Sequence, residues 1–379
     1  MNDPKRLSFP GFGIEEYTFE STPISLFDGK FTINWYALII TTAIILAALY
    51  VWFRFKEHGL KTDDFLDLAL WVVLSGIVGA RLYFIIFKLD DYIITDQGGF
   101  FQNLGASLYE MIAVWKGGLA IYGGVIAGGV AGVLVARKKK INLLQMLDFL
   151  APPVMMAQGI GRWGNFFNVE AFGSVTDVPW RMAGTDVANY LYTDGQIDLA
   201  TKNLIISGEL GVHPTFFYES MWNLLGFLAI WLIFVQIPKT KKLHLFNGQL
   251  FYTYLIWYGL GRAWIEGLRT DSLYLVEGVI RVSQLIAILS LVAGIGLMIF
   301  GFVRYFKYGK GKVRRACEVI ADANKEENKK KKEEEKKKEG NKEPINKEQS
   351  ESKEKDDNGT DNQRQASVPD DQTSPKDGN

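Results

Sequence analysis

The sequence predicts an all-α polytopic membrane protein with seven transmembrane helices, a small extracytoplasmic head and a disordered cytoplasmic tail. Three observations predict this class. Seven mainly apolar segments each reach the length of about 20 residues with which an α-helix crosses about 30 Å of hydrocarbon. Lys and Arg gather in alternate connections between these segments. The charged residues beyond them are concentrated at the C-terminal end, where Phe, Trp, Leu and Ile become rare.

The seven segments are predicted spans because each is a long run of apolar residues. They lie near residues 34–53, 66–88, 116–136, 143–163, 215–236, 247–268 and 282–304. The connections after the odd-numbered spans are basic, as in Arg137-Lys138-Lys139-Lys140, and those after the even-numbered spans are poor in Lys and Arg. The positive-inside rule therefore places the N-terminus outside and the C-terminus in the cytoplasm.

Two of the predicted outer connections are long. Residues 89–115 contain a short amphipathic stretch around Leu104 to Val114, which we expect to lie on the membrane surface. Residues 171–213 are polar and rich in turn residues, and are expected to form the head. The first apolar run begins only near Ile33, after a stretch that contains Glu15, Glu16, Glu20 and Asp28. It lacks the basic start and the cleavage site of a signal peptide, so we expect the N-terminus to be retained.

The chain is expected to divide into a membrane domain, residues 1–308, and a Lys/Glu-rich tail, residues 309–379, that is too polar to form a core. The single cysteine, Cys317, excludes an internal disulfide and a thiolate metal cluster. Three scattered histidines do not suggest a metal site. We expect no metal, no cofactor and no nucleic-acid partner, and assign the tail no catalytic role.

The most informative stretch runs from Gly161 to Gly173, at the outer end of the fourth span. It interleaves glycines with four polar residues: Arg162, Asn165, Asn168 and Glu170. A charge at the edge of a membrane span is costly unless it has a partner or a ligand. The alternative, an arginine that snorkels to the interface, does not explain four polar residues in one short stretch. The pattern therefore indicates an anion site.

Other spans bring polar side chains to the same predicted depth. These are Tyr36, Arg81, Tyr122, His213, Tyr218, Glu219, Arg262, Glu266 and Arg269. Converging arginines suit a phosphate or a carboxylate, because guanidinium offers a planar fork of donors. A phospholipid head group is the most available such anion at the outer interface. Glu266 lies four residues after Arg262 and is equally well explained as its structural partner, and Arg81 as a structural charge inside the bundle.

The stretch from Gly161 to Gly173 resembles the signature of the prolipoprotein diacylglyceryl transferases, which are bacterial membrane enzymes. Other pieces are similar to the same family and extend the resemblance over roughly residues 20 to 305: Asn34-Trp35-Tyr36, Gly79-Ala80-Arg81, His213 through Glu219, and Tyr258 through Arg269. The resemblance implies an enzyme of the cell membrane that acts with phosphatidylglycerol and prolipoprotein signal peptides as its partners. Its reaction transfers the diacylglyceryl group to the lipobox cysteine, forms a thioether and releases glycerol phosphate.

The resemblance also implies roles for individual residues. Arg162, Arg262, Tyr122 and Glu170 are the expected catalytic residues. The expected substrate-binding residues are Tyr36, Arg81, Asn165, Asn168, Gly173, His213, Glu266 and Arg269. The two catalytic arginines would stabilise the departing phosphate and favour the thiolate of the acceptor cysteine, since nearby cations lower a thiol pKa.

Position 122 departs from the family pattern. Many members carry a histidine, thought to act as a base, just before the paired glycines of the third span, where this chain has Tyr122 before Gly123-Gly124. A tyrosine side chain, with an ordinary pKa of about 10, is a poor base at neutral pH. Three alternatives stay open: Tyr122 activated by an arginine, Glu170, or no dedicated base. His213 is a weaker candidate.

Two other functions fit parts of the pattern. A transporter of an anionic lipid or metabolite would also gather arginines within glycine-rich helices. It would usually need access to both sides, whereas few charges lie in the inner halves of these spans. A catalytically silent lipid-binding scaffold is suggested by Tyr122 alone. Turnover of phosphatidylglycerol in the presence of a lipobox peptide distinguishes these functions.

Overall fold

The computed structural model describes residues 4–26, 31–94, 98–114, 117–236, 245–270, 274–276 and 280–308, together with Glu333. All of these except Glu333 belong to one compact unit, Met1–Asp322. The predictions for the tail, including the one for Cys317, concern residues outside those described, with the exception of Glu333. The prediction for His244 also lies outside the described residues.

A long helix lies at each of the seven places predicted for a span. These helices are α1 (Trp35–Glu57), α2 (Thr62–Phe87), α4 (Ile121–Lys138), α5 (Leu143–Asn168), α8 (Thr215–Ile230, continued by a π-helix over Trp231–Gln236), α9 (Gln249–Leu268) and α10 (Val282–Tyr308). Six of them are long and apolar enough to cross a membrane, and α9 does not reach that apolarity. The predicted class, an all-α polytopic membrane protein, is confirmed. That all seven helices cross the membrane stays a prediction.

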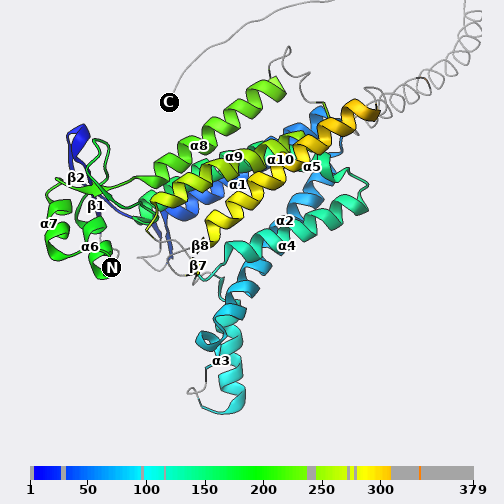
Figure 1. Ribbon diagram of the computed structural model, residues 1–379. Coiled ribbons are helices and arrows are strands. Elements are labelled where there is room, and N and C mark those ends of the chain that lie inside the picture. The colour runs from blue at the N-terminus through cyan, green and yellow to red at the C-terminus, as the bar shows by residue number, and fades with distance from the viewer. Residues whose placement is uncertain are drawn as a thin grey trace, which may run out of the picture. The chain divides into compact units, whose positions relative to one another are not determined.

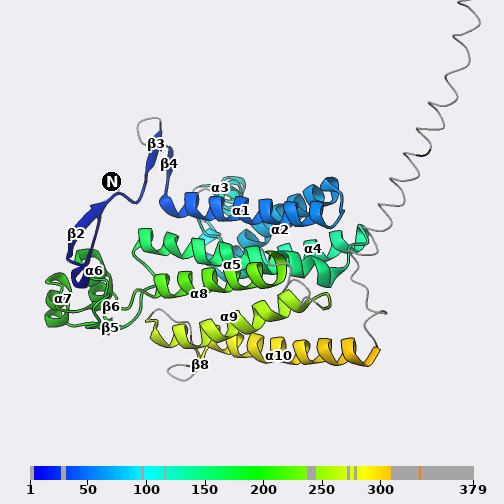
Figure 2. The same cartoon turned by 90° about the horizontal axis from the view of Figure 1, so that it is seen from above.

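The helices form a bundle in which α1, α5, α8, α9 and α10 lie side by side in that order (Figure 2). The remaining pair, α2 and α4, pack closely on each other. Their contact depends on glycine, since a Cβ atom on Gly79 would lie 2.6 Å from the carbonyl oxygen of Gly123. The glycines of the predicted third span therefore allow the close helix approach that small residues permit in membranes.

A small folded head lies beyond one end of the bundle (Figure 1). It contains the predicted segment 171–213, which forms β5 (Val175–Thr176), α6 (Thr185–Thr193), α7 (Leu199–Ile206) and β6 (Gly211–Val212). The N-terminal hairpin, β1 (Lys5–Phe9) and β2 (Ile14–Phe19), completes it.

The hairpin is joined to the head by two hydrogen bonds between Ser8 and Ala183, of 2.8 and 2.9 Å. Leu7, at 1% exposure, packs among the buried residues of α6 and α7. The prediction for the head did not include this hairpin. The pairing of Ser8 with Ala183 joins residues more than 170 positions apart and leaves no local pattern in the sequence.

The long connection after α2 begins with a 3₁₀-helix (Leu89–Tyr92) and continues in α3 (Phe100–Ile112). The predicted amphipathic stretch is thus helical, although it begins earlier than expected. Its large apolar residues, including Phe100, Phe101 and Ile112, are exposed. Contact of α3 with a membrane surface stays a prediction. Two short hairpins, β3 (Ile24–Leu26) with β4 (Phe31–Ile33) and β7 (Tyr274–Val276) with β8 (Ile280–Arg281), also lie at the head end.

Candidate active site

The buried carboxylate of Glu219 organises the polar residues at the head end of the bundle. Glu219 lies in the first turns of α8 and is 4% exposed. Its Oε1 atom accepts from Arg262 at 2.5 Å and from Arg269 at 3.3 Å, while its Oε2 atom pairs with Arg162. One carboxylate is therefore shared by three guanidinium groups.

The three arginines reach Glu219 because the ends of three helices meet here. Arg162 lies near the end of α5, Arg262 lies in the last turns of α9, and Arg269 directly follows α9. Arg262 also pairs with Glu266, one turn further along α9, at 2.7 Å. The ion pair between Arg262 and Glu266 that the sequence suggested is thus present, and Arg262 contacts Glu219 as well.

Arg162 is the member of this cluster best placed to receive an anion. Its side chain is 24% exposed, against 13% for Arg262 and 10% for Arg269. Within the described residues, its only carboxylate partner is Glu219, which it shares with the other two arginines. A positive charge that is partly buried and incompletely compensated favours the binding of an anion.

The signature stretch continues from Arg162 as a chain of hydrogen bonds. Asn165 accepts from Arg162 at 3.3 Å and donates to Oε1 of Glu170 at 2.9 Å. Asn168 donates to the same Oε1 atom at 3.1 Å. The predicted span ended near residue 163, whereas α5 reaches Asn168. Both asparagines therefore lie on the helix. The predicted residues of this stretch therefore form one connected network.

The backbone turns sharply on either side of Glu170. Val169 has φ 53° and Ala171 has φ 57°, both in the left-handed region. This conformation is rare for a β-branched residue such as Val169 and costs about 1–3 kcal/mol. Both residues are buried, at 4% and 8% exposure. The surrounding packing holds this turn, which fixes Glu170 between the helix and the head.

Gly173 joins this turn to the two other helices of the site. Its N–H donates to the carbonyl oxygen of His213 at 2.8 Å, and it forms a β-bridge with Arg269. A Cβ atom here would lie 2.8 Å from Cβ of His213 and 2.9 Å from the carbonyl oxygen of Leu268. The position thus has no room for a side chain, while the expected role of Gly173 in binding substrate stays a prediction.

We expect Gly173→Ala to lower the activity of the site by about 10- to 100-fold, because the added methyl group displaces the backbone that positions Arg269, and errors of about 1 Å can cost 10²-fold. Gly129→Ala is the matched control, since nothing lies within 4 Å of the position of its Cβ atom. Turnover of both variants, at equal amounts of membrane-inserted protein, checks this. Equal activity would show that the turn tolerates the displacement.

Tyr36 and His213 border the site without joining the ion pairs. The ring of Tyr36, in the first turn of α1, lies against Gly164, whose Cβ atom would be 2.7 Å from that ring. The Nδ1 atom of His213 lies 3.2 Å from the hydroxyl of Tyr218. Burial lowers the pKa of His213 below its ordinary value.

Arg81 is not brought to Glu219. Its guanidinium donates to backbone carbonyls at the end of α3 and in the turn before α4, namely those of Glu110, Met111, Ala113, Gly117 and Gly118. Ring-face contact with Tyr92 completes its surroundings. This geometry matches the structural charge that was one of the two interpretations of Arg81, and contact with a substrate stays a prediction.

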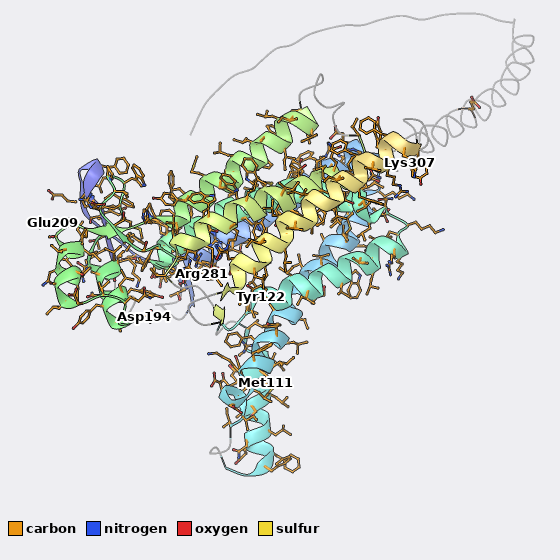
Figure 3. All side chains as sticks on the ribbon, in the orientation of Figure 1. Met111, Tyr122, Asp194, Glu209, Arg281 and Lys307 are labelled. Atoms are coloured by element: carbon orange, nitrogen blue, oxygen red, sulfur yellow. The ribbon has the colours of Figure 1, made fainter. Side chains whose placement is uncertain are left out.

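Tyr122 lies in the first turn of α4 and is 45% exposed. Its ring centre is 6.5 Å from that of Tyr83. Among the described residues, none forms a hydrogen bond with its hydroxyl group. Figure 3 shows Tyr122 at the head end of α4, on the same side of the bundle as the labelled Arg281.

Glu219 is the main residue that the sequence analysis left outside the expected site. It was noted at the same depth as the arginines but received no role. The signal was present, since a carboxylate inside a membrane segment usually has a cationic partner. Which of several arginines it pairs with depends on the faces that α5, α8 and α9 turn to one another.

The fold and the site together define a polytopic helical membrane protein with a buried cluster of arginines and carboxylates at one end of its bundle. A comparison with protein families matches residues 23–300 to the prolipoprotein diacylglyceryl transferases. This chain belongs to that family, whose members are transferases. Every residue of the Glu219 cluster lies within the matched segment.

Individual relatives agree. The phosphatidylglycerol–prolipoprotein diacylglyceryl transferase of Acaryochloris marina is 37% identical over 270 residues, which cover 71% of this chain and 86% of the relative. Those of Staphylococcus aureus (strain MRSA252) and Staphylococcus carnosus are each 38% identical, over 75% and 77% of this chain and 90% and 94% of the relatives. The transporter alternative receives no support from these comparisons.

Proposed function

We propose that this protein transfers the diacylglyceryl group of phosphatidylglycerol to the lipobox cysteine of prolipoproteins, the first step of lipoprotein maturation. The observation that carries the proposal is the sharing of the Glu219 carboxylate by Arg162, Arg262 and Arg269. A phosphodiester is the anion that such a cluster fits, because guanidinium groups bind phosphate oxygens in pairs. The names of the relatives supply the lipid and the protein substrate.

In the proposed reaction, the cysteine sulfur attacks the glyceryl carbon that bears the phosphate. A C–S bond forms, the C–O bond to phosphate breaks, and the electron pair leaves with glycerol phosphate. The thiol proton passes to water before or during attack, and the phosphodiester monoanion leaves as the glycerol phosphate dianion. Arg162 and Arg262 stabilise the charge that develops on the leaving phosphate, and the same positive field favours the thiolate.

We place the Glu219 cluster toward the outer leaflet, with the N-terminus outside and the C-terminus in the cytoplasm. The basic ends of α1, α4 and α10 support this orientation. They include Lys56, Arg137 and Lys307, and Figure 3 shows Lys307 at the end of the bundle away from the head. Under the positive-inside rule that end faces the cytoplasm. The head would then be extracytoplasmic.

The test is turnover by the purified protein in vesicles that contain phosphatidylglycerol, with a peptide carrying a lipobox cysteine. Formation of the diacylglyceryl thioether, followed by mass spectrometry, supports the proposal. The same peptide with serine in place of cysteine is the control for the nucleophile. Lipid binding or movement without thioether formation would overturn the proposal and favour the silent scaffold or a transporter.

Tyr122 can be tested in the same assay. Because its hydroxyl makes no hydrogen bond within the described part of the chain, we expect Tyr122→Phe to keep activity within about threefold of the wild type, less than the 10²-fold or more contributed by a general base. Comparison of the initial rates of the two proteins over a range of pH checks this. Loss of most of the activity in the Phe variant would instead make the phenol part of the chemistry.

A further inference from the structure

The head contains a pocket of about 470 Å³ that the proposed chemistry does not use. One wall is the end of the signature stretch, Asn168, Val169 and Glu170. The other residues that line it come from β1 and from α6 with the residue that follows it: Lys5, Asp186, Asn189, Tyr190, Thr193 and Asp194. Its volume is in the range of specific ligand sites, about 300–1,000 Å³.

The pocket is joined to the arginine cluster through Glu170. Two hydrogen bonds, from Arg162 to Asn165 and from Asn165 to Glu170, span the distance between them. Both asparagine amides use Oε1 of Glu170, and neither contacts Oε2. Glu170 is thus shared between the anion site and the pocket, and the strained turn at Val169 and Ala171 fixes it there.

We infer that this pocket receives the polypeptide segment that directly follows the acceptor cysteine. The inference rests on the proposed function, in which the thiol reacts beside Arg162. A signal peptide approaches that point along the membrane, so the chain beyond the cysteine must continue on the head side. The pocket begins there, since its wall is the continuation of the residues that hold Arg162.

The charge of the lining predicts which segments are preferred. Three carboxylates, Glu170, Asp186 and Asp194, face one ammonium group, that of Lys5. The Asp186 carboxylate accepts a hydrogen bond from the backbone N–H of Arg6 at 2.6 Å, which holds it in place. Like charges across an interface are unfavourable. Acceptors with basic or neutral residues after the cysteine should bind better than those with acidic residues.

The experiment compares three lipobox peptides in the transfer assay: one that ends at the cysteine as an amide, one extended by Ser-Ser-Lys-Lys, and one extended by Ser-Ser-Asp-Asp. With the wild type, we expect KM for the basic extension to be about tenfold lower than for the acidic one. The truncated peptide should be a poorer substrate than the basic one, because it leaves the pocket empty.

Three variants test whether the pocket sets this preference. The quantity compared is KM for the acidic extension divided by KM for the basic one. Asp194→Lys should reduce this ratio several-fold, and Lys5→Glu should increase it. Glu209→Lys makes the same charge change as Asp194→Lys, but Glu209 is exposed and is not among the residues that line the pocket, so this variant should keep the wild-type ratio. Figure 3 labels both residues on the head.

Equal KM values for the three peptides, or an equal response to Asp194→Lys and Glu209→Lys, would overturn the inference while leaving the proposed function intact. Opposite shifts in the Asp194 and Lys5 variants would support it, because damage to the fold cannot change the ratio in both directions. Failure to modify any peptide would overturn the proposed function, and this inference with it.

Discussion

Replacement of Glu219 by Gln is expected to lower diacylglyceryl transfer by about 100-fold or more. The carboxylate is 4% exposed and is the shared partner of Arg162, Arg262 and Arg269. A neutral amide would leave three guanidinium groups close together without their common counter-charge. Breaking a buried ion pair in this way costs about 3–5 kcal/mol, so the arginines would move away from the positions in which we propose that they bind the phosphate.

The measurement is the transfer rate at saturating lipid, together with the amount of protein that inserts into membranes. Glu219→Asp should retain more activity than Glu219→Gln, because it keeps the charge and only shortens the side chain. Glu209→Gln is the control for loss of a carboxylate, since Glu209 is exposed on the head. A Glu219→Gln protein that inserts normally and keeps a third of the wild-type rate would show that the shared carboxylate does not organise the site.

The transmembrane part of the fold could be predicted because its cause is local. A run of about 20 apolar residues specifies a membrane helix whatever its neighbours are, and α5 and α10 begin at the expected residues, Leu143 and Val282. The helix α9 shows the limit of this reasoning. Its apolar run is interrupted by Arg262 and Glu266, which are tolerated because they pair with each other and because Arg262 also pairs with Glu219 of α8.

The pairing of residues far apart in the chain could not be predicted in the same way. Depth along the spans predicted that Arg81 and Arg162 would lie at one level, but depth does not determine direction around a helix. The structure turns Arg81 toward the end of α3 and Arg162 toward Glu219. The same limit explains why the contact of Ser8 with Ala183, which adds the N-terminal hairpin to the head, was missing from the prediction.

The second large effect is expected at Arg262, where a lysine should not replace the arginine. Its Nη1 atom contacts Glu219 at 2.5 Å and its Nη2 atom contacts Glu266 at 2.7 Å. The guanidinium thus holds two buried carboxylates at once, which the single ammonium group of lysine cannot do with the same geometry. We expect Arg262→Lys to lose about 100-fold in transfer rate and Arg262→Ala to lose all measurable transfer.

Arg162 should behave differently toward the same pair of substitutions. It contacts one carboxylate, Glu219, and the neutral amide of Asn165, so a lysine can keep the charge that the phosphate needs. We therefore expect Arg162→Lys to retain more activity than Arg262→Lys, while Arg162→Ala loses all measurable transfer. Arg137→Ala, at the exposed basic end of α4, is the control for insertion. If the two lysine variants were equally active, the carboxylate contacts would not distinguish the arginines, and positive charge alone would account for both.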